Sequence, residues 1–192
     1  FEVEWLGGGA DAPQVHHVTN LLLHLANSAL FLLLLRVLKI PLAIGFAASL
    51  AFAMHPLHVE PVAWISARKD LLSGFFSLLS LLAYVRHCRL APSVSGWGLL
   101  SLVAALAAMV SKPVAVVLPV LLVLLDFIPQ GPETEARAAR YSLLRLLVEK
   151  WLFFLMAIGL ALISIKAQYA GSLASDIGQQ DLLHRLADIP AK

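Results

Sequence analysis

Long apolar segments alternate with short polar ones along most of this chain. A helix needs about 20 residues, at about 1.5 Å each, to cross a hydrocarbon layer of about 30 Å. By this measure the pattern predicts about six membrane-spanning helices. They cover residues of about 18–37, 42–56, 71–86, 94–111, 113–128 and 151–166. The predicted fold is therefore all-α, a polytopic transmembrane helical bundle.

The remaining segments are predicted to lie outside the bilayer. Residues 1–17 read as the end of an external loop, 129–150 as a cytoplasmic loop, and 168–192 as the start of another external loop, around a membrane domain of 18–167. The sequence Ser111-Lys112-Pro113 interrupts the apolar stretch of the fourth and fifth spans. Because proline disfavours helix for the residue before it, we expect a hairpin there.

The composition supports a membrane protein and excludes some partners. Of 192 residues, 60% are hydrophobic and 14% are charged, with a mean hydropathy of +0.85, which is far from the balance of a soluble domain. The net charge of +2 and the scattered basic residues argue against nucleic acid as a partner. The first residue is Phe1 and no signal peptide is visible, so we expect an internal fragment of a longer protein.

The basic residues predict an orientation in the membrane. One set of alternate connections holds eight of them, and the opposite set holds six that are more widely spread and mixed with acids. The larger set comprises Arg36, Lys39, Arg86, Arg89, Arg137, Arg140, Arg145 and Lys150. By the positive-inside rule this set is cytoplasmic. The segment of residues 55–70, the start of the first span and Lys112 are then predicted to share the periplasmic or lumenal face.

The segment HPLHVEPVAWISARKD concentrates ionisable groups between two apolar spans. Ionisable groups at a membrane boundary are costly and often mark a functional site. His55, His58 and Glu60 are candidates for lining a substrate pocket at the helix ends, with structural capping as the alternative. The spacing is not HExxH, and Pro56 and Pro61 break any helix that would fix metal ligands. A divalent metal bound by the two histidines and Glu60 is therefore the less supported alternative.

Arg68, Lys69, Asp70 and Lys112 suggest an anionic ligand. Adjacent cations at a membrane surface repel unless an anion compensates them, and a phosphate suits both guanidinium and ammonium groups. The alternative is that the cations reach lipid headgroups. Asp70 is predicted to cap a helix that begins at Leu71. Cationic groups together with histidines on the outer face of a polytopic protein suggest a lipid-linked anionic substrate that enters from the bilayer.

The first predicted span carries a polar stripe. His17, Asn20, His24 and Asn27 are spaced by three, four and three residues, so they project from one side of a helix. Such a stripe lines either a substrate cavity or an interhelical hydrogen-bond seam. It fades after Asn27, so a cavity would open toward the end at which this helix begins.

Four segments carry a family resemblance. HHVTNLLLHLANSALFLLL, AFAMHPLHVEPVAWISARKDLLSGFFSLLSLLAY, MVSKPVAVVLPVLLVLLDF and EKWLFF follow one another in this order. They resemble bacterial multi-pass membrane proteins with C-terminal tetratricopeptide repeats, which are similar to the eukaryotic transmembrane, tetratricopeptide-containing protein O-mannosyltransferases of the GT-C class. The resemblance implies a GT-C-like fold in the bacterial inner membrane or endoplasmic reticulum. It also implies sugar transfer from a polyprenyl-phosphate donor to a protein hydroxyl on the periplasmic or lumenal face.

The resemblance also implies roles for residues. An acidic base is expected in a loop upstream of Phe1 and the repeats downstream of Lys192, so the fragment alone is expected to be inactive. Arg68 and Lys69 would hold the donor phosphate, while His58 and Glu60 would line the acceptor side. Two other readings stay open, a polytopic transporter or lipid flippase and a non-catalytic membrane anchor for interaction repeats.

Overall fold

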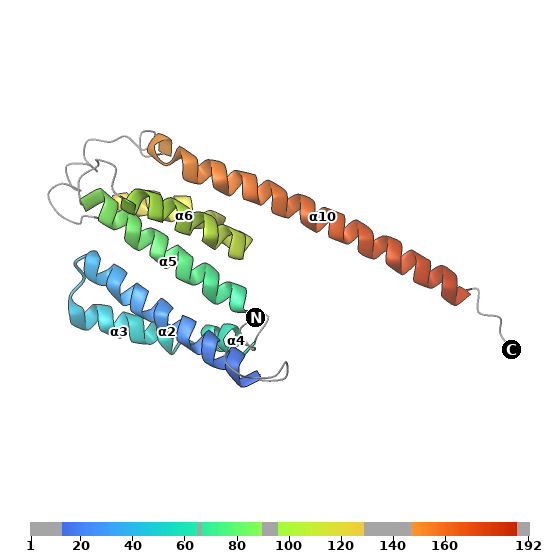
Figure 1. Cartoon of the computed structure of the whole chain (residues 1–192), viewed down its shortest axis with the longest axis horizontal. Helices are drawn as coiled ribbons and strands as arrows, with labels where there is room; N and C mark the ends of the chain where they lie inside the picture. The colour runs from blue at the N-terminus through green and yellow to red at the C-terminus, as the bar shows by residue number, and fades with distance from the viewer. Residues whose placement is uncertain (1–12, 65–66, 90–95, 129–146, 188–192) are drawn as a thin grey trace.

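The computed structural model describes residues 13–64, 67–89, 96–128 and 147–187, and every element in these ranges is helical. The prediction of an all-α fold is confirmed (Figure 1). The elements in chain order are α2 (Pro13–Val37), α3 (Leu42–Ala53), η1 (Pro56–His58), α4 (Val59–Ala63), α5 (Arg68–Arg89), α6 (Gly96–Ser111), η3 (Pro113–Val117), α7 (Leu118–Asp126) and α10 (Trp151–Ala187).

Three of the described helices are long and apolar enough to cross a membrane, Val15–Val37, Arg68–Cys88 and Trp151–Tyr169. A fourth span results if Leu42–Ala53 and Pro56–Ala63, which meet at an angle of 51°, count as one broken span. The helices over the two other predicted spans are apolar but shorter. Length and composition therefore support three or four spans in a multi-pass membrane protein, and the total of about six stays a prediction.

Prolines mark the helix interruptions at Pro56 and Pro113. The expectation that Pro61 breaks a helix is wrong, because it lies within the short helix α4 (Val59–Ala63). Pro56 follows the end of α3 and opens η1, and Pro113 opens η3 after Lys112 has adopted an extended conformation with φ −151° and ψ 125°. The interruption predicted at Lys112 is thus present. Helix α10 continues to Ala187, beyond its candidate membrane span of Trp151–Tyr169. The first proline after Trp151 is Pro190, so no residue in between forces the helix to end.

Helix α5 occupies the middle of the bundle, between α2 and α6 (Figure 1). One apolar cluster joins α2, α5 and α7 through Leu34, Leu82, Val85 and Leu122. The second cluster is rich in small side chains, and its buried members are Ala105, Ala108, Met109, Ala115, Leu118 and Ala157. Small residues let membrane helices approach closely, which substitutes for the hydrophobic driving force that lipid does not supply.

The ends of the helices meet in two groups. Arg68 at the start of α5 contacts His16 near the start of α2, and Asp70 contacts Lys112 directly after α6. This end of the bundle is called the motif end. At the opposite end, Tyr84 of α5 contacts Asp126 at the end of α7, and Lys150 precedes α10. We call it the basic end.

Candidate functional site

Arg68 is the best connected side chain at the motif end. Its Nε donates to Asn20 Oδ1 over 3.0 Å, and its Nη2 donates to Thr19 Oγ1 over 2.8 Å. Nη2 also lies 3.0 Å from His16 Nδ1. A guanidinium group can only donate, so His16 Nδ1 must be the acceptor and the proton of a neutral His16 lies on Nε2. These bonds hold the half-buried Arg68 against α2 in one orientation.

The polar stripe of α2 bonds to backbone carbonyls of neighbouring helices. Asn20, His24 and Asn27 are 0%, 5% and 3% exposed. Asn20 Nδ2 donates to the carbonyls of Val62 and Trp64 over 3.4 and 3.3 Å. His24 Nε2 lies 3.0 Å from the carbonyl oxygen of Ala53. Asn27 Nδ2 donates to the carbonyl of Leu71 over 3.0 Å. Most of these carbonyls stand where α3 and α4 end, and a broken helix at membrane depth needs such partners. The geometry therefore supports the interhelical seam for these three residues.

His17 does not take part in the stripe. Its side chain is exposed, and His16 occupies the fourth position instead. At 100° per residue, both histidines lie roughly 50° from the centre of the stripe, on opposite sides, so the helical period alone does not distinguish them. The contact with Arg68 shows that His16, and not His17, belongs to the polar group. The spacing along the helix identified neither His16 nor Thr19.

Of the four candidate anion-binding residues, the structure pairs Asp70 with Lys112 and places Arg68 and Lys69 next to each other in the first turn of α5. Lys112 Nζ lies 2.7 Å from Asp70 Oδ1, and these side chains are 37% and 28% exposed. Lys69 is exposed, next to Arg68 in the first turn of α5. The expectation that Asp70 caps a helix beginning at Leu71 is wrong, because α5 begins at Arg68 and Asp70 lies within its first turn. The carboxylate instead pairs with Lys112.

Two neighbouring cavities lie beside the η1 and α4 segment. One has a volume of about 420 Å³ and the other about 340 Å³, and His55 and His58 line both. His24 lines the larger one, and its ring centroid is 5.1 Å from that of His58. Glu60 is exposed and lines neither cavity. In the described ranges, no group of three or more His, Cys, Asp or Glu side chains is placed to bind a metal ion.

A polar cluster at the basic end was not anticipated. The Lys150 ammonium group pairs with Asp126 Oδ2 and lies 5.1 Å from the centre of the Tyr84 ring, while the Tyr84 hydroxyl donates to Asp126 Oδ1 over 2.8 Å. The sequence predicts Lys150 at the end of a cytoplasmic loop, and the structure shows that its side chain is only 1% exposed. The one available signal was Asp126, an acid that ends an apolar helix and therefore needs a partner.

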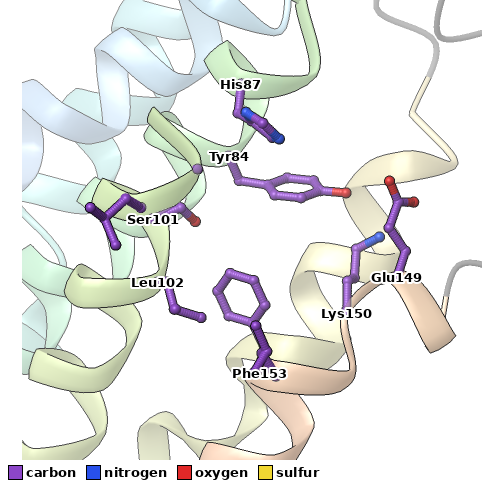
Figure 2. Close-up of a pocket in the computed structure, with 10 residues that line it drawn as sticks. Tyr84, His87, Ser101, Leu102, Glu149, Lys150 and Phe153 are labelled. Carbon is purple, nitrogen blue, oxygen red and sulfur yellow. The ribbon is translucent and has the colours of Figure 1, made fainter. Parts of the chain in front are cut away.

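Figure 2 shows Tyr84, Lys150 and Glu149 beside a cavity of about 350 Å³, which Leu102 and Phe153 close on another side. This cavity lies at the opposite end of the bundle from the conspicuous sequence motif. Of its two charged lining residues, Lys150 is already neutralised by Asp126, and Glu149 is exposed. The motif end is therefore the better candidate site.

Comparisons with known proteins point in one direction. No family model and no solved structure matches the chain. It is 43% identical over 98 residues to protein O-mannosyl-transferase tmtc2 of Xenopus laevis, and 41% identical over 88 residues to protein O-mannosyl-transferase TMTC2 of Homo sapiens. Over these stretches the chain is similar to protein O-mannosyl-transferases. Protein O-mannosyl-transferase Tmtc1 of Drosophila melanogaster is 35% identical over 147 residues.

These matches cover 50%, 46% and 74% of the chain but only 12%, 10% and 16% of the relatives. The chain thus spans a small part of the length of the proteins that it resembles. The expected resemblance to this group of proteins is confirmed to that extent. A bacterial origin, tetratricopeptide repeats and the fragment status stay predictions.

Proposed function

We propose that the whole protein carrying this chain is an integral-membrane glycosyltransferase. It transfers a mannosyl group from a polyprenyl-phosphate donor to a protein hydroxyl, at the motif end, on the periplasmic face of a bacterial inner membrane or the lumenal face of the endoplasmic reticulum. The similarity to protein O-mannosyl-transferases supports the reaction class. The positive-inside rule supports the face.

The observation that carries the proposal is the group of cations around the first turn of α5. Arg68 and Lys69 stand in this turn, and Lys112 is held beside it by its pair with the carboxylate of Asp70. The N-terminus of this 22-residue helix adds a partial positive charge. A lipid phosphate bound here would leave as a phosphate anion when the sugar is transferred, and cations placed around it stabilise the charge that develops.

The bonds from α2 give Arg68 a further property. Asn20, Thr19 and His16 fix the guanidinium group before any ligand binds. A guanidinium group that is already oriented does not need to reorganise during the reaction. It therefore stabilises the charge of the transition state more strongly. In this proposal Arg68 and Lys69 hold the phosphate, and Lys112 contributes through its exchangeable pair with Asp70. His58 faces the substrates from the neighbouring cavities, whereas Glu60, which lines neither cavity, is left without a role.

The transporter reading has less support from the described residues. A transporter needs polar positions that continue from one face to the other. The polar stripe of α2 is occupied by backbone carbonyls. Beyond Asn27, the buried Ser80 is paired with Ser101. Lys150 and Tyr84 are paired with Asp126. A non-catalytic membrane anchor differs from the proposal in lacking transferase activity, which the following experiment measures.

Replacement of Arg68 by alanine in the whole protein tests the proposal. We expect mannosyl transfer from polyprenyl-phosphate mannose to fall by about 100-fold or more, the usual loss when one charge-stabilising donor is removed. Arg36→Ala is the matched control, because Arg36 is an exposed arginine at the other end of α2. Membrane insertion and thermal unfolding of both variants are measured in parallel. A correctly inserted Arg68→Ala protein with unchanged transfer would refute the role.

A further inference from the structure

The larger cavity at the motif end has an unusual lining for its position. It lies between α2, which contributes Leu21 and His24, and the segment from Ala53 to Ala63. Its volume of about 420 Å³ falls within the usual range of small-molecule sites. Apart from three histidines, all the residues that line it are apolar. Such sites typically orient a ligand through a few polar groups in an apolar wall.

Two of the three histidines are fixed by the backbone. His24 Nε2 lies 3.0 Å from the carbonyl oxygen of Ala53, which can only accept, so Nε2 carries a proton. In the neutral ring His24 Nδ1 is then an acceptor, and it is buried without a hydrogen-bond partner. His55 Nδ1 accepts from the backbone N–H of Leu57 over 3.2 Å. Each ring therefore has one nitrogen committed to the protein.

His58 differs from both. It lines both cavities and is only half-buried, and none of the hydrogen bonds within the described ranges uses its imidazole. Its ring packs against that of Phe52 at 4.4 Å and lies 5.1 Å from that of His24. These aromatic contacts keep the ring in place. Both of its nitrogens remain available to a ligand.

The lining also indicates the chemistry of the ligand. No lysine, arginine, aspartate or glutamate lines either cavity among the described residues, so neither an anion nor a cation would find a counter-charge there. A neutral imidazole offers one donor and one acceptor. A hydroxyl group also donates once and accepts, so it matches the imidazole in both directions.

We propose that this cavity is a hydroxyl-binding subsite in which His58 makes the contact. His24 lines the same cavity, and its ring lies 5.1 Å from that of His58. The hydroxyl belongs either to the sugar of the lipid-linked donor or to a serine or threonine of the acceptor protein. The subsite rests on the proposed glycosyltransferase function, because that function supplies both hydroxyl-bearing substrates.

The first test is a chemical footprint that does not depend on turnover. Diethyl pyrocarbonate modifies accessible unprotonated imidazoles, and mass spectrometry measures the modification of His58 in the purified whole protein. If the sugar occupies the subsite, polyprenyl-phosphate mannose protects His58 and polyprenyl phosphate does not. If the acceptor occupies it, a serine- and threonine-containing peptide protects His58 and its alanine counterpart does not. Absence of protection by all four probes overturns the subsite.

The second test uses kinetics of variants. His58→Phe keeps the ring contacts but removes both nitrogens, and should raise the KM of the protecting substrate about three- to tenfold, the value of one hydrogen bond between neutral groups. His58→Gln keeps a donor and an acceptor and should recover part of this loss. His87→Gln is the control, because His87 is a half-buried histidine at the basic end. An unchanged KM in His58→Phe overturns the subsite.

The two tests separate the subsite from the proposed function. Mannosyl transfer by a protein whose His58 is never protected would leave the glycosyltransferase function intact and refute the subsite. Protection of His58 in a protein that transfers no mannose would refute the proposed function and leave the subsite standing.

Discussion

The buried pair of Lys150 and Asp126 allows a quantitative prediction. Replacing Lys150 by methionine keeps most of the volume of the side chain but removes its charge. The Asp126 carboxylate, whose side chain is only 7% exposed, then lacks its counter-ion. Since a buried charge without a partner is costly, we expect the variant to be strongly destabilised.

The magnitude follows from burial and from the one contact that remains. Removing one partner of a buried ion pair costs about 3–5 kcal/mol, and both side chains here are more than nine-tenths buried, so solvent screening requires little discount. The Tyr84 hydroxyl still donates to Asp126 Oδ1 over 2.8 Å and offsets part of the loss. We therefore expect about 3 kcal/mol, which for a chain of this size corresponds to a fall in Tm of roughly 6–12 °C.

The assay is thermal unfolding of the chain in detergent, followed by circular dichroism, for Lys150→Met, Asp126→Asn and the double variant. Because the double variant contains no unpaired charge, it should recover at least about 2 kcal/mol relative to Lys150→Met. Lys112→Met is the comparison, since its pair with Asp70 is partly exposed and should contribute less than about 1 kcal/mol.

The reasoning would be refuted if Lys150→Met and Lys112→Met shifted the Tm equally. It would also fail if the effects of Lys150→Met and Asp126→Asn were simply additive in the double variant, because a pair that interacts across a buried contact must show a coupling energy.

Two further predictions concern the polar stripe and the orientation in the membrane. Asn20→Leu leaves the carbonyls of Val62 and Trp64 and the Nε of Arg68 without their amide partner. It should lower the free energy of unfolding by about 2–3 kcal/mol in the same thermal assay. The control is Ser28→Ala, which removes a local bond to the carbonyl of His24 and should change this free energy by less than about 0.5 kcal/mol. In a Cys88→Ser background, Leu57→Cys should react with a membrane-impermeant maleimide added from the periplasmic or lumenal side. Leu147→Cys should react only after permeabilisation. The reverse pattern would contradict the orientation predicted by the positive-inside rule.

Several local features were predictable because they depend on neighbouring residues. Proline cannot continue a helix, so the interruption at Lys112 followed from Pro113 alone. The apolar segments identified the helices because each must satisfy its own backbone within lipid. Hydropathy indicates where an apolar span ends but not where its helix ends, and α10 continues past the candidate span Trp151–Tyr169 to Ala187.

Features that depend on two distant segments could not be predicted in this way. The helical period left His16 and His17 nearly equivalent, and only the contact with Arg68, 52 positions away, distinguishes them. Similarly, Lys150 resembled any other basic residue of a loop, because its partner Asp126 precedes it by 24 positions. Glu60 belonged to the motif by sequence, yet its side chain is exposed and lines neither cavity beside it.

The sequence by itself determined the all-α membrane class and the interruptions at Pro56 and Pro113, because these follow from local hydropathy and backbone chemistry. The tertiary structure decided which polar groups are partners. It assigned the amides of Asn20 and Asn27 to backbone carbonyls, Lys112 to Asp70, and left His58 available in a cavity. The physical reason is that burial makes every polar group require a partner, while only the packing of distant helices determines which partner is within reach.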